Sequence, residues 1–299
     1  MISRTYANGV IAAKEKYFLG DKLLRLIETD AASALRALKE SGFGGENDGA
    51  ENANFSSDET ETLIAAEEAK TNAFIREYAG SDAEKEYFLA PLDCHNVKAY
   101  FKAKLTGAEE TKMLAPEGAL AVKKIAEAFE TEDYSLLPAY LALAVAEAEK
   151  ACEGGAAGKG AEVGAAFEKA LYAHLFEICK GAGKARRALR GALKEKADLT
   201  NLVTALRSGS AETAAGQYVP CGALSAEDFS FCFAENTEQA EKLYNKACAS
   251  AGGSKKKTLK TVYELYRIAK ESGSVAEAEK RLAETEIRLF EARKYELSG

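Results

Sequence analysis

The chain has 299 residues, a mass of 32.0 kDa and a formal net charge of −7, from 40 basic against 47 acidic side chains. This length allows roughly one to three domains, and the acidic balance lacks the clustered positive charge that binds nucleic acid. The longest apolar run, 136–146, is well short of the ~20 residues that a membrane-spanning helix needs. We therefore expect a protein that neither binds nucleic acid nor spans a membrane.

The composition predicts an all-α fold, because the chain has only 4 Pro and is rich in Ala, Glu, Lys and Leu. The N-terminal region has no continuous apolar core followed by a small-residue cleavage site, so no signal peptide is predicted and we expect a cytoplasmic location. The 6 cysteines form no C-x-x-C pair and are accompanied by only 2 histidines, so we expect packed, reduced thiols and no zinc site.

Three short helices are predicted at the N-terminus. The first covers 6–18, the second 21–27, and the third runs from a cap at Thr29 or Asp30 to a stop at Gly42.

A mobile loop is predicted over 42–57, where glycine, asparagine and acidic residues show no periodicity. Ser56 and Glu59 form a capping-box pattern that starts the next helix, which continues to Tyr78. A further helix is expected from about Ala90 to 107.

Joints and stops divide the rest of the chain. Helices are predicted at 120–129, at 134–146 with Pro138 in the first turn, at 167–178 and at 189–209, with a flexible joint at 153–164. After a capping-box pair at Ser225 and Asp228, helices are predicted around 240–244, 259–266 and 278–289, with a joint at 250–257.

Two sequence patterns occur twice at nearly equal spacing. The P-x-G-A-L block at 116–120 returns at 220–224, and the D-x-x-N pattern at 93–97 returns at 198–202. The agreement of spacing indicates copies of one unit. The repeat signature consists of Asp93, Asn96, Pro116, Gly118, Asp198, Asn201, Pro220 and Gly222.

We therefore predict three similar helical domains, at 1–115, 116–219 and 220–299. The third closing helix would fall at about residue 303, beyond Gly299, so the third domain is expected to lack it. Repeated units usually make a shaped surface for a partner instead of one catalytic pocket. Within each repeat, the aspartate and asparagine side chains of D-x-x-N share a helix face. We expect these side chains to anchor one helix to another rather than to bind a partner.

Other chemical patterns are weak. Cys94 and His95 are adjacent on a helix and point about 100° apart, so they are not expected to act as nucleophile and base. The glycines of 154–160 lack the spacing of a phosphate-binding loop. The basic stretch 184–194 is interpreted as a solvated helix face, and His174 as a packed histidine.

Several stretches resemble the C-subunit family of V-type and A-type ATPases and ATP synthases, which is related to the d subunit of the eukaryotic vacuolar ATPase. The stretch 87–99, YFLAPLDCHNVKA, is similar to the family's Y-D-x-H-N-φ-K signature with Leu92 in place of Tyr. The opening 6–14 is similar to the family's start. The segments 113–120 and 218–224 resemble its L-x-P-G-G-x-L turns, with Glu117 and Cys221 replacing the first glycine.

The resemblance covers the whole chain but departs at the C-terminus, where family members generally continue into a final helix with a Glu-Ile and Arg pattern. It implies a pseudo-threefold funnel of three helical domains, with a socket for the central shaft and a seat on the membrane proteolipid ring. It further implies a non-catalytic coupling component without cofactors, peripheral at the cytoplasmic face of the membrane and monomeric when isolated. Partner-facing candidates are Asn96, Lys98, Asn201 and Arg207.

Two alternatives remain open. A generic helical-repeat scaffold or adaptor would share this architecture without a role in ion pumping, and copurification with proteolipid and shaft subunits would separate the two. An enzyme would need an acid and a base in one pocket, and no recurring cluster singles out such a pair. The choice between proton and sodium, and between synthesis and hydrolysis, is not encoded in these patterns.

Overall fold

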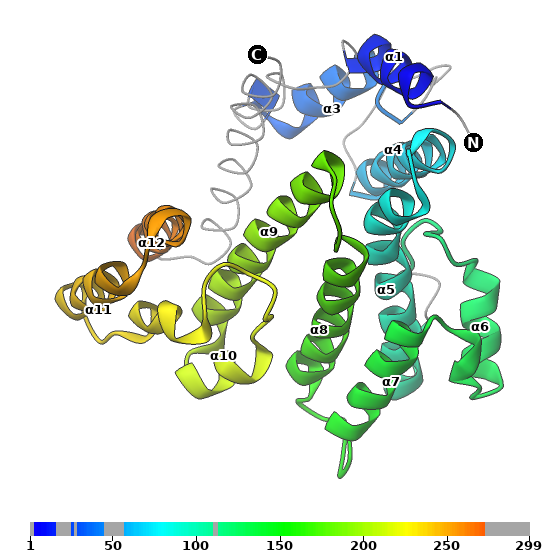
Figure 1. Cartoon of the computed structure of the whole chain (residues 1–299). Helices are drawn as coiled ribbons and strands as arrows, with labels where there is room; N and C mark the ends of the chain where they lie inside the picture. The colour runs from blue at the N-terminus through cyan, green and yellow to red at the C-terminus, as the bar shows by residue number, and fades with distance from the viewer. Residues whose placement is uncertain (1–2, 16–24, 27–28, 45–56, 110–112, 273–299) are drawn as a thin grey trace. The chain divides into compact units, whose positions relative to one another are not determined.

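The computed structural model describes residues 3–15, 25–26, 29–44, 57–109 and 113–272. Within those ranges the regular structure is all helical, so the predicted fold class is confirmed (Figure 1). The elements are α1 (Arg4–Glu15), α3 (Ala31–Glu40), α4 (Ser57–Tyr78), α5 (Asp82–Thr106), α6 (Val122–Glu130), η2 (Tyr134–Leu136), α7 (Ala139–Ala151), α8 (Gly160–Ile178), α9 (Lys184–Ser208), α10 (Ala211–Gln217), η3 (Ala226–Phe233), α11 (Thr237–Ser250) and α12 (Gly253–Ser272).

The helices fall into two compact units. Unit 1 contains the chain up to Asp93 together with 115–119, and unit 2 contains 94–114 and the chain from Leu120 through α12. The long helix α5 contributes to both. The division into three similar domains at 116 and 220 stays a prediction, as does their arrangement in a funnel.

In unit 1, the residues at both ends of the short helix α3 stabilise it. Asp30 is the cap of α3, since its Oδ1 accepts a hydrogen bond from the Ser33 backbone N–H at 3.0 Å. Gly42, at φ 78°, supplies the left-handed residue that follows the helix end. An ion pair between Lys39 and Glu59 joins α3 to α4.

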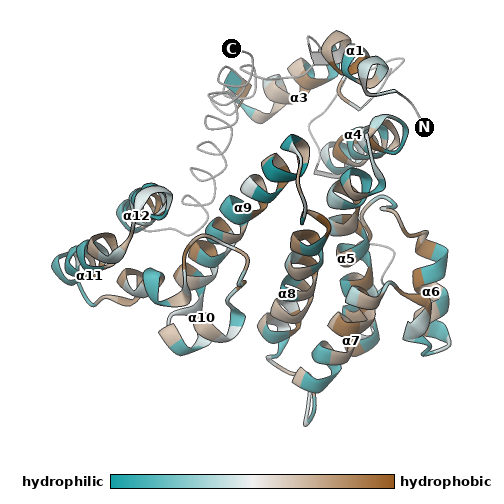
Figure 2. Cartoon of the chain, in the orientation of Figure 1, coloured by the Kyte–Doolittle hydropathy of each residue, from teal (hydrophilic) through white to brown (hydrophobic). Residues whose placement is uncertain are grey.

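In unit 2, α7 and α8 pack side by side, and their contact is apolar (Figures 1 and 2). Leu141 and Val145 of α7 are fully buried. On α8, the buried Phe167 lies edge-on to Phe101 of α5, with ring centroids 5.9 Å apart. Figure 2 shows hydrophobic residues over much of α7 and α8 and hydrophilic residues over much of α9.

The C-terminal part of unit 2 has an aromatic core. Phe231 of η3 is fully buried and lies edge-on to Tyr263 and Tyr266 of α12, with centroids 5.2 Å away in each case. Tyr244 of α11 stacks on Tyr263 at 3.9 Å. Each aromatic pair contributes about 0.5–1.5 kcal/mol beyond its buried area, so this cluster joins η3, α11 and α12.

The long helix α5 differs from its prediction. It begins at Asp82, earlier than the expected Ala90, and Pro91 lies in its interior. Asp82 and Glu84 occupy the first turn, where their charges favour the positive end of the helix dipole. The end at Thr106 is as predicted, with Gly107 at φ 67°.

The predicted joints are shorter in the structure. The joint expected at 153–164 ends where α8 begins at Gly160, and the one expected at 250–257 ends at Gly253. Pro138 precedes α7 as its N-cap instead of lying in its first turn. The sequence patterns do not predict the short helix α10, although Ser210 caps it by accepting from the Thr213 N–H at 3.1 Å.

Several predictions concern residues outside the described ranges. These are most of the second helix at 21–27, most of the loop at 42–57 with the Ser56 capping position, and the helix at 278–289.

Candidate functional site

The D-x-x-N pattern of α9 is hydrogen bonded to the P-x-G-A-L loop that follows α10. Asp198 is fully buried, and its Oδ2 and Oδ1 accept the backbone N–H groups of Ala223 and Leu224 at 2.9 and 3.1 Å. Asn201 forms a two-way pair with Val219: its Oδ1 accepts from Val219 N at 2.8 Å and its Nδ2 donates to Val219 O at 2.9 Å. We call this arrangement the second latch.

The first copy of the motifs forms a corresponding contact, the first latch, within unit 1. Asp93 Oδ2 accepts from the backbone N–H of Ala119 at 3.0 Å. Arg76 of α4 adds hydrogen bonds to the carbonyl oxygens of Glu117 and Gly118, the latter at 2.7 Å. The near-equal spacing in the sequence therefore has a geometric cause, since in both copies the acidic side chain of one motif binds the backbone of the other.

The matching geometry of the two loops requires glycine. An added Cβ at Gly118 would lie 2.2 Å from Asp93 Oδ1, and one at Gly222 would lie 2.0 Å from Asp198 Oδ1. Real Cβ atoms do not approach so closely. The glycine of P-x-G-A-L thus allows the loop backbone to reach the carboxylate.

Burial raises the pKa of Asp198 from 3.8 to about 6, because desolvation disfavours its charged form. The hydrogen bonds from Ala223 and Leu224 act in the opposite direction, and the negative charges of Asp228 and Glu195 add to the rise. Asp198 therefore titrates just below neutral pH and serves as a backbone acceptor in its ionised form.

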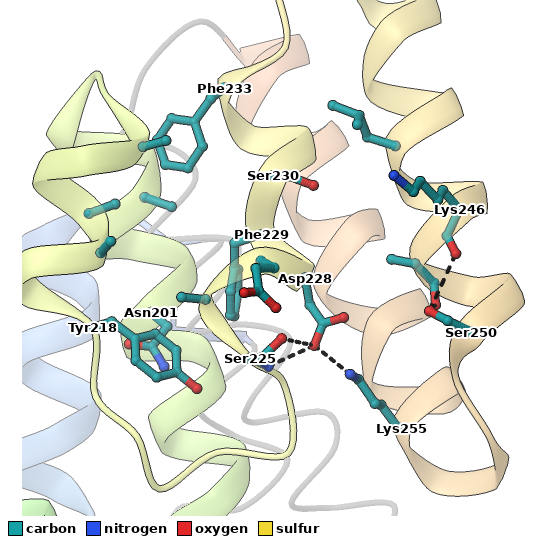
Figure 3. A pocket seen from close by; sticks show the side chains of 18 residues that line it. Asn201, Tyr218, Ser225, Asp228, Phe229, Ser230, Phe233, Lys246, Ser250 and Lys255 are labelled. Carbon is teal, nitrogen blue, oxygen red and sulfur yellow. Dashed lines mark hydrogen bonds and ion pairs between the residues drawn. The ribbon is translucent and has the colours of Figure 1, made fainter.

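A pocket of about 730 Å³ lies beside the second latch (Figure 3). Asn201 and Tyr218 form one side, and Lys246 and Lys255 of α11 and α12 form the other. Its volume is within the range of small-ligand sites. The apolar lining comes mainly from Ala205, Ala211, Ala214, Ala215, Phe229, Phe233, Leu243 and Ala247.

The base of this pocket holds Asp228, whose carboxylate has both an ion-pair partner and hydrogen-bond donors. Asp228 Oδ2 pairs with Lys255 Nζ at 2.7 Å and accepts from the backbone N and Oγ of Ser225 at 2.6 and 2.8 Å. Burial acts to raise the pKa of Asp228, but the bonds from Lys255 and Ser225 outweigh it and lower the pKa below its usual value. The predicted capping box is confirmed, although the element it starts, η3, is a 3₁₀ helix.

Among the described residues, no group of three or more His, Cys, Asp or Glu side chains could hold a metal ion. Cys94 and His95 point to different partners: Cys94 Sγ lies 3.6 Å from Phe167 O, and His95 Nε2 donates to Met113 O at 2.8 Å. His174 stacks on Tyr140 with centroids 4.0 Å apart, so its prediction as a packed residue is confirmed.

Two arginines in the basic stretch of α9 form hydrogen bonds to the backbone at the end of α8. Arg186 and Arg190 donate to the carbonyl oxygens of Lys180 and Cys179 at 2.8 and 3.3 Å. These carbonyls end α8, where cations favour the negative end of the helix dipole. Lys184 is exposed at the start of α9.

The described part of the chain contains no helix that is both long and apolar enough to cross a membrane. In a comparison with protein families, residues 7–297 match the model described as the ATP synthase (C/AC39) subunit. The chain belongs to the ATP synthase (C/AC39) subunit family. Comparisons with curated proteins and with solved structures gave no significant match.

The four candidate partner-facing residues of this C/AC39 family member differ in exposure. Asn96 is 0% and Asn201 3% exposed, and Asn201 also lines the pocket. Lys98 is partly buried and lies 3.7 Å from Glu168. Arg207 is exposed near the end of α9. Both asparagines are buried, and the assignment of the four residues to a partner-facing surface stays a prediction.

The pocket of this C/AC39 family member is not evident from the sequence. Its lysines, Lys246 and Lys255, lie 28 and 37 positions from Tyr218 in the chain, so no local motif connects them. The sequence does hint at the pocket through a difference in length. The connection from Phe233 to α11 in the third copy is shorter than the corresponding connection from Phe129 to α7 in the second copy.

Proposed function

We propose that this C/AC39 chain is a non-catalytic central-stalk subunit, which couples the rotating shaft to the membrane proteolipid ring of a V/A-type ATPase or ATP synthase during proton or sodium transport. The family match over residues 7–297 carries this proposal. On this proposal the chain binds the shaft and the ring at the cytoplasmic face of the membrane, is monomeric when isolated and has no active site of its own.

The two latches supply a physical reason why the chain suits such a role. A part that transmits torque must resist bending where its helices meet its loops. Asp93 and Asp198 each bind a loop backbone through hydrogen bonds to a carboxylate, which are stronger than neutral ones. The glycines that face them let the loop backbone pack directly against each carboxylate.

Specificity for the partners would come from charged residues on exposed faces. The chain carries 40 basic and 47 acidic side chains, which can form complementary contacts with a partner. Arg207 remains a proposed partner contact because its side chain is exposed. Lys98 remains one with a smaller accessible surface. We expect Arg207→Glu to weaken assembly with the shaft or the ring, as measured by copurification.

The test is reconstitution of the rotary complex in lipid vesicles with and without this chain. Without it, we expect the catalytic head to hydrolyse ATP while ion uptake into the vesicles is lost, and we expect uptake to return when the purified chain is added. Ion uptake that is unchanged in its absence would contradict the proposal. ATP hydrolysis by the purified chain alone would favour an enzyme instead.

A further inference from the structure

The pocket of unit 2 lies where the third copy of the repeat departs from the second. Counting from the P-x-G-A-L blocks, Phe129 of α6 corresponds to Phe233 of η3. Counting from the D-x-x-N patterns, Tyr100 of α5 corresponds to Ala205 of α9. Both Phe233 and Ala205 line the pocket.

Two tyrosines cover the corresponding phenylalanine, Tyr134 from the second copy and Tyr100 from the end of the first copy. The ring of Phe129 stacks on Tyr100 at 5.7 Å and meets Tyr134 of η2 edge-on at 5.3 Å. Lys104 holds this turn by donating to Glu132 Oε1 at 2.7 Å and to Tyr134 Oη at 3.1 Å. The acidic and aromatic turn of the second copy, together with Tyr100 and Lys104 from the end of the first copy, thus closes the site.

This turn is held against backbone strain. Glu132 has φ 55°, an uncommon conformation for a residue with a side chain. Such conformations persist where surrounding contacts fix them, and here the contact is the ion pair with Lys104. The hydrogen bond from Lys104 lowers the pKa of Glu132, which keeps its carboxylate charged.

None of these closing groups has a counterpart at the corresponding described positions around Phe233. Ala205 replaces Tyr100 and Gly209 replaces Lys104. The residues 130–138 connect Phe129 to α7, whereas only 234–236 connect Phe233 to α11, so no counterpart of η2 is present. The open space of about 730 Å³ against Phe233 and Ala205 is the result.

The pocket also supplies positive charge for an acidic partner. Figure 3 shows Lys246 on α11 with its side chain extended toward η3, and Lys255 below it. Lys255 is paired with Asp228, so Lys246 is the cation better placed to meet a new carboxylate. We propose that this pocket binds an acidic and aromatic turn of a partner protein, chemically like the segment Glu132–Tyr134 that closes the second copy.

The ring of the partner would fill the space beside Phe233 and Ala205, and its carboxylate would approach Lys246. This proposal does not depend on the rotary function, because it rests on the difference between two copies within one unit. A free peptide pays the full ordering cost of binding, so we expect a dissociation constant between about 0.1 and 5 mM.

The probe is a synthetic peptide with the sequence of residues 131–138, TEDYSLLP, blocked at both ends. It is titrated into the full chain labelled at alanine methyl groups and followed by NMR. We expect saturable shifts of Ala205, Ala214 and Ala247, which line the pocket. A peptide carrying Tyr134→Ala should bind at least tenfold more weakly.

Protein variants make the assignment specific. Ala205→Tyr, which restores the ring of the second copy, should reduce peptide affinity at least tenfold, whereas Ala192→Tyr on the exposed surface of the same helix should not. Lys246→Glu should weaken binding about fivefold, and because this side chain is exposed the variant serves if Ala205→Tyr fails to fold.

Three outcomes would overturn the proposal. The first is the absence of saturable shifts at 5 mM peptide, and the second is equal binding of the two peptides. The third is a set of shifts that depends on protein concentration without peptide, which would assign the pocket to a second copy of this chain.

Discussion

At Gly222, a single methyl group decides whether the second latch can form. Gly222→Ala would place a Cβ 2.0 Å from Asp198 Oδ1, against a carboxylate fixed by two backbone N–H groups. Since relief of this clash would break the hydrogen bonds that hold Asp198, we expect a loss of about 2–3 kcal/mol in the free energy of unfolding, the size of a typical overpacking penalty. Urea denaturation measures it.

The matched control is Gly191→Ala in the exposed part of α9, where an added Cβ meets nothing within 4 Å. Alanine should stabilise this helix by up to about 1 kcal/mol. Similar stabilities for the two variants would mean that the close approach in the second latch is not a constraint.

The pKa of Asp198 gives the second latch a pH dependence. Its pKa is 3.8 when unfolded and about 6 in the folded chain, so below pH 4 both states are protonated and above that the folded state binds the proton more tightly. The associated stability is therefore fully present below about pH 4 and is lost as pH rises through 6. The difference between the two pKa values corresponds to about 3 kcal/mol.

Asp198→Asn tests this pH dependence, because an amide does not titrate. We expect the wild-type free energy of unfolding to fall between pH 3 and pH 7 by about 3 kcal/mol more than that of the variant. The variant should also lose about 1–3 kcal/mol at pH 4, since its amide N–H₂ would face one of the two N–H donors. Parallel pH profiles would show that Asp198 is not the titrating group.

At the scale of elements, the first latch connects α4 to the loop at 115–119 through Arg76. Arg76→Met keeps the apolar stem of the side chain but removes both hydrogen bonds to Glu117 O and Gly118 O. We expect a loss of about 1–2 kcal/mol, at the lower end for charged hydrogen bonds because the site is partly exposed.

Thermal unfolding followed by circular dichroism would measure the effect of Arg76→Met. Lys256→Met on the exposed face of α12 is the control for removal of one charge, and it should leave the midpoint unchanged. Equal unfolding midpoints for the two variants would show that Arg76 does not stabilise the first latch.

Element types were predictable from the sequence, but several boundaries and the pocket were not. Local signals such as the Asp30 cap and the Ser225 capping box predict correctly because they depend on neighbours in the chain. The interior position of Pro91 is not predicted, because packing of a long helix overrides the local preference of proline. The joints are shorter than predicted because Gly160 and Gly253 begin helices although glycine is a poor helix former.

The candidate site shows the same division. The repeat spacing leads correctly to a structural role for Asp93 and Asp198, since a repeated distance between two motifs implies a contact between them. The burial of Asn96 and Asn201 is not evident from the sequence, because the side on which a helix is covered depends on segments distant in the sequence. The pocket depends on absent residues, which only a comparison of two copies can reveal.

At the scale of the whole molecule, the latches and the proposed rotor function make one joint prediction. If stiffness of unit 2 transmits torque, a variant with a weakened second latch should lower the number of ions moved per ATP hydrolysed in reconstituted vesicles. Gly222→Ala is the variant, studied at a temperature where circular dichroism shows it folded, and Gly191→Ala is the control.

We expect Gly222→Ala to bind the complex at the wild-type level and to leave ATP hydrolysis by the head intact, since the proposed role gives this chain no part in the chemistry. The ratio of ion uptake to ATP hydrolysis should fall at least twofold, because a softer coupling element dissipates torque as internal bending. If the folded and bound variant keeps the wild-type ratio of ion uptake to ATP hydrolysis, the second latch contributes to the stability of the chain and not to coupling.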